Sequence, residues 1–240
     1  MWYAKPSGSY TLMDDEAIAN ITEMAGLLRE AGYTIEAQSG VIGNSYGESG
    51  LNPWRWQVDT VNYNLGYGLF QFTPARGRTI DGHYYPGYFS ECTGLEGYAP
   101  NTSTSQVVSG ASPSDGYCQT NVLITDYLGK WVSTCWRSYW DETEYPDLKN
   151  MSDNILNTYG NGSRLTQAQF ANINNISAAT FAFLACYEGP LVPNFNQRYG
   201  YACDVYAILS NTPPVPPTPP TPPSTRRGKL PIWMMCKKIH

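Results

Sequence analysis

The stretch TPPVPPTPPTPPS at residues 212–224 most constrains the fold, because eight of its residues are prolines. Proline lacks a backbone N–H and fixes φ, so this segment cannot extend a helix or join a sheet and adopts an extended polyproline II conformation. We expect a stiff linker that advances about 3.1 Å per residue. The compact domain is therefore predicted at 1–211, and the short tail at 225–240 is too small to form its own core.

Charge divides at the same linker. All 20 acidic residues precede residue 212, whereas five of the 15 basic residues follow it, so the body carries −10 and the tail +5. A nucleic-acid partner requires a basic face that displaces phosphate counterions, so the acidic body argues against one. The basic tail, which contains Trp233, is predicted to bind the bacterial wall, a membrane surface or phage tail proteins. A solvated terminus is the alternative interpretation.

The chain shows neither a membrane-spanning segment nor a targeting segment. Its longest apolar stretch, residues 177–187, is far shorter than the roughly 18 to 20 residues that span a bilayer. The N-terminus does not place basic residues before an apolar run, so we expect no signal peptide.

The six cysteines and two histidines lack the short paired spacings of a metal site, so no metal is expected. Cys92 and Cys118 bracket a Ser/Thr/Gly-rich stretch and could form a disulfide in an oxidising compartment. Without a signal peptide, free thiols are the favoured expectation.

Apolar residues recur at helical spacing along the body. They predict helices at 14–30, 34–48, 120–140, 151–158, 165–172, 176–187 and 197–210. Gly40, Gly43 and Gly47 in the second segment predict close helix packing, since glycine otherwise weakens a helix. A small β element is expected near residues 58–73, with a short strand at 67–73. The fold class is mainly α (α+β), with a small β-hairpin and an aromatic loop region.

Glu48 stands out at the C-terminal end of the second predicted helix. The negative end of the helix dipole disfavours an ionised carboxylate there, which suits a general acid. Gly50 is expected to end the helix and Asn52-Pro53 to turn the chain away, which leaves Glu48 at a lip. From position alone, a solvated terminal glutamate is the alternative.

Six aromatic residues follow within positions 54–72, interleaved with amide side chains. Aromatic faces combined with amide donors suit sugar rings, so we expect a ligand groove here, with Phe70 and Trp56 assigned to the core. Gly66 and Gly68 flank Tyr67 and predict a close backbone approach, either a tight turn or the floor of the groove.

These residues also carry a family resemblance. Glu48-Ser49 followed by Gly68-Leu69-Phe70-Gln71 resembles the signature of goose-type lysozymes and soluble lytic transglycosylases, whose usual motif has Met where Phe70 stands. The fuller pattern, GN at 43–44, ESGLNP at 48–53 and GYGLFQFTP at 66–74, is more similar to the phage tail lysozyme domain. The resemblance implies a lysozyme-like α fold and a protein of the phage tail, or of the host cytoplasm before release.

By position, the resemblance implies that Glu48 protonates the glycosidic oxygen between N-acetylmuramic acid and N-acetylglucosamine in peptidoglycan, without a cofactor. Ser49, Tyr67, Gln71 and Thr73 would line the sugar site. Tyr187-Glu188-Gly189-Pro190 resembles a Tyr-Glu-Arg-Pro element that could bring a tyrosine or carboxylate near Glu48, although Gly189 replaces the arginine. A simple helix terminus is the alternative there.

Hydrolysis of a glycosidic bond generally uses two carboxyl groups, about 5 Å apart for retention and about 6.5 to 9.5 Å apart for inversion. Asp59 is the first candidate for the second carboxylate, with Asp81, Glu91 and Glu188 as alternatives. A lytic transglycosylase would use Glu48 alone, with the muramic acid 6-hydroxyl as nucleophile. A thiol peptidase using Cys186 and His83, or a non-catalytic wall-binding tail module, are the rival interpretations.

Overall fold

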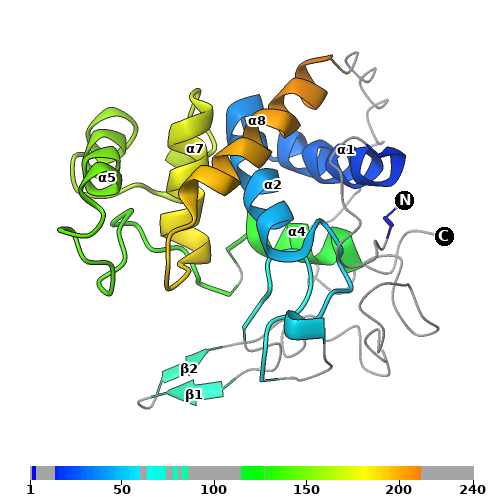
Figure 1. Cartoon of the computed structure of the whole chain (residues 1–240), viewed down its shortest axis with the longest axis horizontal. Helices are drawn as coiled ribbons and strands as arrows, with labels where there is room; N and C mark the ends of the chain where they lie inside the picture. Colours follow the sequence, from blue (N-terminus) through cyan, green and yellow to red (C-terminus); the bar gives the residue numbers. More distant parts are fainter. Residues whose placement is uncertain are drawn as a thin grey trace, which may run out of the picture.

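The computed structural model describes residues 2–3, 14–59, 64–73, 78–80, 83–85, 115–126 and 128–211. The predicted linker at 212–224 and tail at 225–240 lie outside these residues, as do Cys92, Asp81 and Glu91. The fold is mainly α-helical, as predicted from the sequence (Figure 1). Its helices are α1 (Asp15–Glu30), α2 (Ile35–Ser49), α4 (Asp115–Ile124), α5 (Pro146–Thr158), α6 (Gln167–Phe170), α7 (Ile176–Phe183) and α8 (Phe195–Asn211).

The first two predicted helices are confirmed, and local chemistry explains their ends. The side chain of Asp14 accepts a hydrogen bond from the Ala17 N–H and caps α1, and Thr34 caps α2 through the Ala37 N–H. Gly50 ends α2 with a left-handed φ of 64°, a conformation that glycine adopts without strain.

Helix α2 lies at the centre of the molecule, and α7 and α8 pack against it (Figure 1). A Cβ atom added to Gly40 would lie 2.7 Å from the backbone carbon of Ala179, and one added to Gly43 would lie 2.6 Å from the Ala202 nitrogen. Both distances are shorter than real Cβ contacts. The close packing predicted from these glycines is therefore confirmed. It fixes the position of α2 against α7 and α8.

The helix predicted at 120–140 is wrong beyond Ile124, where α4 ends. Asp126, Gly129 and Cys135 all have positive φ, which a continuous helix does not allow. The backbone pairs with distant segments instead: the Val132 N–H donates to the Cys186 carbonyl at 2.7 Å. The regularly spaced apolar residues after Ile124 therefore do not form a helix. They contact the core from a segment without regular secondary structure.

The β element differs from its predicted place. Residues 67–73 form a tight turn with isolated bridges from Tyr67 to Trp56 and to Phe72, because Gly68 and Gln71 both have positive φ. An antiparallel hairpin instead joins β1 (Arg78–Ile80) to β2 (His83–Tyr85), with Ile80 opposite His83.

The aromatic residues of the expected groove form core. Trp54, Trp56, Tyr67, Phe70 and Phe72 are all at most 1% exposed. The groove prediction is therefore wrong for most of these rings, because their apolar area is buried against other helices. Of these five described rings, Trp56 and Phe70 also line the cavity beside Glu48.

The described cysteines divide into two kinds. Cys135, Cys186 and Cys203 are free thiols, whereas Cys118 is disulfide-bonded, so the expectation of free thiols is wrong at Cys118. The suggested partner Cys92 lies outside the described residues.

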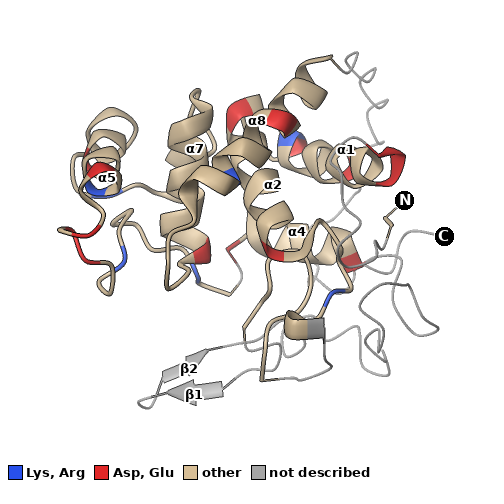
Figure 2. Cartoon of the chain, in the orientation of Figure 1, with Lys and Arg blue, Asp and Glu red and all other residues tan. Residues whose placement is uncertain are grey.

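No helix within the described ranges is long and apolar enough to cross a bilayer. Across those ranges, acidic positions lie on several helices and basic positions are few and separate (Figure 2).

Candidate active site

A cavity of about 360 Å³ opens beside the C-terminal end of α2. It is bounded by the end of α2, the loop after it, the turn at 70–73, the segment that follows α4 and the end of α7. Its lining residues are Glu48, Arg55, Trp56, Gln57, Val58, Phe70, Gln71, Thr73, Lys130, Glu188 and Pro190. The volume lies within the range of sites that bind small ligands.

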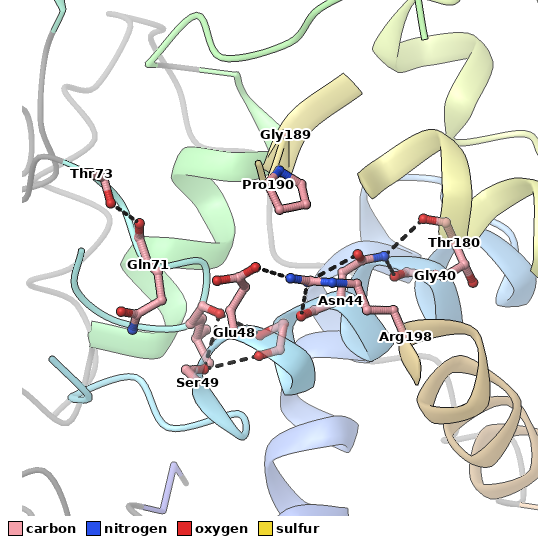
Figure 3. Close-up of polar contacts among 12 residues, drawn as sticks. Gly40, Asn44, Glu48, Ser49, Gln71, Thr73, Thr180, Gly189, Pro190 and Arg198 are labelled. Atoms are coloured by element: carbon pink, nitrogen blue, oxygen red, sulfur yellow. Dashed lines mark hydrogen bonds and ion pairs between the residues drawn. The ribbon is translucent and has the colours of Figure 1, made fainter. Parts of the chain in front are cut away.

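Glu48 forms an ion pair with Arg198 on α8, which makes it a fixed group rather than a solvated terminal glutamate. Arg198 is buried, and its Nη1 donates to the carbonyl of Asn44 at 3.1 Å and to its Oδ1 at 3.3 Å. Asn44 in turn donates to the Thr180 carbonyl of α7 at 3.1 Å. Figure 3 shows Glu48 between Arg198 on one side and Gln71 on the other.

Ser49 and Tyr67 do not line the cavity, which corrects the expectation that they contact a sugar. Both are completely buried. The Ser49 hydroxyl donates to the carbonyls of Ser45 and Leu69, at 3.2 and 3.1 Å. The Tyr67 hydroxyl donates to Asp115 Oδ2 at 3.1 Å. These bonds attach the motif loop, residues 66–73, to α2 and α4. Both residues therefore stabilise the loop without contacting the cavity.

Gln71 and Thr73 line the cavity. Gln71 is half-buried, and its Nε2 donates to the carbonyls of Arg55 and Gly68 at 3.1 and 3.0 Å. Thr73 is exposed, and its hydroxyl donates to the Gln71 carbonyl at 2.8 Å (Figure 3). Both side chains are thus available at the surface of the cavity for polar contact with a ligand.

Gln119 of α4 holds the loop at residues 66–73 in place, a role that no sequence pattern indicates. It is completely buried. Its Oε1 accepts from the Leu69 N–H at 2.7 Å, and its Nε2 donates to the Pro53 carbonyl at 2.7 Å. A Cβ atom at Gly68 would lie 2.2 Å from Gln119 Oε1, which explains why glycine stands there.

Glu188 places a second carboxyl group in the same cavity as Glu48. It ends a π-helical turn, η3 (Leu184–Glu188), and Gly189 with φ 57° turns the chain away after it. Its Oε1 is buried without a hydrogen-bond partner among the described residues. Burial, and then the charge of Glu48, raise the pKa of Glu188 to about 8. Glu188 is therefore predominantly protonated at neutral pH.

Tyr187 is completely buried and does not line the cavity. Its ring stacks on Phe183 with centroids 5.1 Å apart, and burial raises the pKa of its hydroxyl well above the ordinary value. Tyr187 therefore belongs to the core. Of the tyrosine and the carboxylate that the resemblance suggested near Glu48, the carboxylate of Glu188 lines the same cavity.

Two cations near Glu188 were missed because both lie in the segment predicted as helix. Lys130 lines the cavity, and its Nζ lies 4.9 Å from the centre of the Tyr187 ring. Burial lowers the pKa of Lys130. The Nε of Arg137 donates to the Ala185 carbonyl at 2.6 Å. A Cβ atom at Gly189 would lie 2.5 Å from the Arg137 guanidinium, so Arg137 occupies the space beside Gly189.

With this geometry in place, comparison with known proteins identifies the N-terminal part of the site. Residues 19–107 match the phage tail lysozyme family. The resemblance found from the motifs is thereby confirmed over this segment. Within the chain, 76 residues are also 38% identical to "Morphogenesis protein 1" of Bacillus phage B103, an alignment that covers 31% of this chain and 20% of that protein.

The phage tail lysozyme segment contains Glu48, Gln71 and Thr73 but ends before Lys130, Glu188 and Arg198. Segments later in the chain therefore supply these charged groups around Glu48.

Asp59, Cys186 and His83 are the other candidates from the sequence. Asp59 belongs by its backbone to the short helix η1 (Gln57–Asp59), but its side chain lies outside the description. Cys186 is a buried thiol beside Cys135, and burial raises its pKa, so it lacks the exposed thiolate of a thiol peptidase. The side chain of His83 is likewise outside the description. The part of the chain described contains no group of three or more residues that could hold a metal ion.

Proposed function

We propose that this protein is a peptidoglycan muramidase that cleaves the β-1,4 bond between N-acetylmuramic acid and N-acetylglucosamine, with Glu48 as the general acid. One observation carries this proposal: Glu48, which the phage tail lysozyme segment supplies, shares a cavity with a second carboxyl group, Glu188. Two carboxyl groups that flank one bond are the usual machinery of glycoside hydrolysis.

The reaction assigns roles to the cavity residues. Glu48 donates its proton to the glycosidic oxygen as the bond to C1 breaks, and the second carboxylate assists water at C1. Gln71 and Thr73 offer amide and hydroxyl groups for sugar hydroxyls, and Trp56 and Phe70 belong to the apolar part of the lining.

Two other functions fit the same segment. A lytic transglycosylase would use Glu48 as acid and the muramic acid 6-hydroxyl as nucleophile. The third candidate is a non-catalytic tail module. It agrees with the name of the phage B103 relative, which refers to morphogenesis.

Digestion of purified peptidoglycan, with mass spectrometry of the released muropeptides, separates the three. The variants are wild type, Glu48→Gln and the control Glu142→Gln, which changes an exposed carboxyl group outside the cavity. A muramidase releases reducing muramic acid ends, lost only in Glu48→Gln, whereas a transglycosylase releases 1,6-anhydro ends. No glycan cleavage by folded wild type would contradict the proposal and support the non-catalytic module.

The domain organisation belongs to the same proposal. A catalytic unit at 1–211 would be joined by the linker at 212–224 to the basic tail at 225–240, which would hold the protein on the wall or on phage tail proteins. Deletion of 225–240 should reduce sedimentation with cell walls without reducing cleavage of soluble glycan fragments. Unchanged sedimentation and unchanged incorporation into particles would contradict the role given to the tail.

A further inference from the structure

Two carboxyl groups face one cavity in this protein, and their surroundings differ. Glu48 is paired with a buried arginine, whereas Glu188 has a buried oxygen without a hydrogen-bond partner in the described part of the chain. We propose that Glu48 and Glu188 share a single proton and act as one carboxyl pair during glycan cleavage. This inference rests on the muramidase proposed above and names a role for a residue outside the matched family segment.

The partner of Glu48 is a buried cation. The Arg198 guanidinium is held by three acceptors, the carbonyl and Oδ1 of Asn44 and the Glu48 carboxylate. Since the side chain of Arg198 is only 8% exposed, solvent screens this ion pair weakly. Glu48 is therefore held in the free protein as the partner of the Arg198 guanidinium.

The surroundings of Glu188 favour its neutral form. Three of the four partnerless buried side-chain atoms among the described residues are in this cluster: Arg137 Nη2, Tyr187 OH and Glu188 Oε1. Charged groups face Glu188 from three sides, with Glu48 on α2, Arg198 on α8, and Lys130 and Arg137 in the segment after α4. Burial and Glu48 outweigh the three cations and raise the pKa of Glu188 to about 8. The proton of the pair thus resides on Glu188.

Transfer of that proton prepares both groups at once. The proton moves from Glu188 to the Glu48 carboxylate, which leaves the charge of the pair unchanged, and Lys130 and Arg137 stabilise the new Glu188 carboxylate. Glu48 then protonates the glycosidic oxygen, and the electron pair of the breaking C1–O bond goes to that oxygen. Water adds to C1 and gives its proton to Glu188. One bond and one water are consumed, and the pair again holds one proton.

The first test measures the proton directly, without activity. The full chain is labelled at the glutamate side-chain carboxyl carbon with ¹³C, and each resonance is followed by NMR between pH 4 and pH 10. We expect one glutamate to titrate above pH 7, to disappear in Glu188→Gln and to shift to lower pH in Glu48→Gln, because the Glu48 charge is removed. A titration midpoint of Glu188 in the ordinary glutamate range would overturn the proposal. So would a midpoint that is the same in wild type and in Glu48→Gln.

The second test measures cleavage. Glu188→Gln should lose about 100-fold or more in rate, the ordinary contribution of general acid–base catalysis, yet still sediment with peptidoglycan. Glu188→Asp retains a titrating carboxyl group and should keep part of the rate, whereas the control Glu142→Gln should keep all of it. Circular dichroism establishes that each variant is folded.

The outcomes separate this inference from the proposed function. If Glu188→Gln keeps the wild-type rate and pH profile while Glu48→Gln is inactive, the inference of a shared proton is wrong. The proposed muramidase activity is then still supported. If folded wild type does not cleave glycan, the muramidase is wrong, and so is the role of the pair in cleavage.

Discussion

The ion pair between Arg198 and Glu48 joins two helices whose residues are 150 positions apart in the chain. Arg198 lies on α8, beyond the matched family segment, and Glu48 ends α2 within it. The same arginine also bonds to Asn44 one turn earlier on α2. One side chain therefore fixes the end of α2, orients the Glu48 carboxylate and connects the lysozyme motif to the last helix of the body.

Removal of the Arg198 charge should destabilise the protein. Arg198→Met removes the cationic partner of Glu48 and both bonds to Asn44 from a largely buried position, so we expect a loss of about 2 to 4 kcal/mol in the free energy of unfolding. The control is Lys149→Met, because the Lys149–Asp153 pair is more exposed and contributes less than about 1 kcal/mol. Urea unfolding at pH 7 measures both, and equal losses would contradict the assigned role of Arg198.

The glycine at the contact between α2 and α8 should not tolerate a side chain. In Gly43→Ala the new methyl group meets the Ala202 backbone, so we expect a loss of about 1 to 3 kcal/mol despite the better helix propensity of alanine. Gly26→Ala in α1 is the matched control, since a Cβ there meets nothing within 4 Å and should be neutral or stabilising. Thermal unfolding of the two variants compares them, and an unchanged Gly43→Ala would show that the helices are less tightly packed.

Stability should fall as the pH rises toward 8. The pKa of Glu188 is about 8 in the folded protein, above the ordinary value of 4.5, so the folded state holds a proton that the unfolded state has lost. The stability from this group is complete below about pH 4.5 and is lost as the pH rises through 8. Urea midpoints measured from pH 5 to pH 8 should therefore fall more steeply in wild type than in Glu188→Gln. Parallel slopes would contradict a protonated Glu188.

Gln119 should be essential for the motif loop. Gln119→Ala leaves the Leu69 N–H and the Pro53 carbonyl unpaired in the core, at a cost of about 2 to 4 kcal/mol for the two groups. We also expect reduced glycan cleavage, because the loop that carries Gln71 loses its support. Gln197→Ala is the control, since Gln197 is exposed and bonds only to the Tyr201 hydroxyl among the described residues. Chemical denaturation together with the muropeptide assay measures both effects, and an ordered loop in active Gln119→Ala would exclude this role.

Local sequence determined much of the helical framework. Asp14 and Thr34 cap helices whose apolar residues repeat every three or four positions, and Gly50 ends α2 just beyond Glu48. The glycines of α2 indicate close helix packing without information about which helices are its neighbours. These features depend on residues within a turn or two of each other, so the linear order of the chain contains the needed information.

The same local reasoning failed where distant segments decide the conformation. The period at 120–140 looks helical, but positive φ at Asp126 and Cys135 breaks it, and the backbone of this segment pairs with the end of α7. The aromatic residues that suggested a sugar groove are buried because α4 and α7 cover them, which their own spacing does not reveal.

The sequence by itself determined the helices, their caps and the placement of Glu48 at the end of one of them. Only the tertiary structure decided what surrounds Glu48, namely Arg198 from α8, Glu188 from the turn η3 and Lys130 from an irregular segment. Charge, burial and proton affinity in a cavity depend on distances between side chains in space. Those distances are set by helix packing between segments 80 to 150 positions apart, and a linear pattern does not record them.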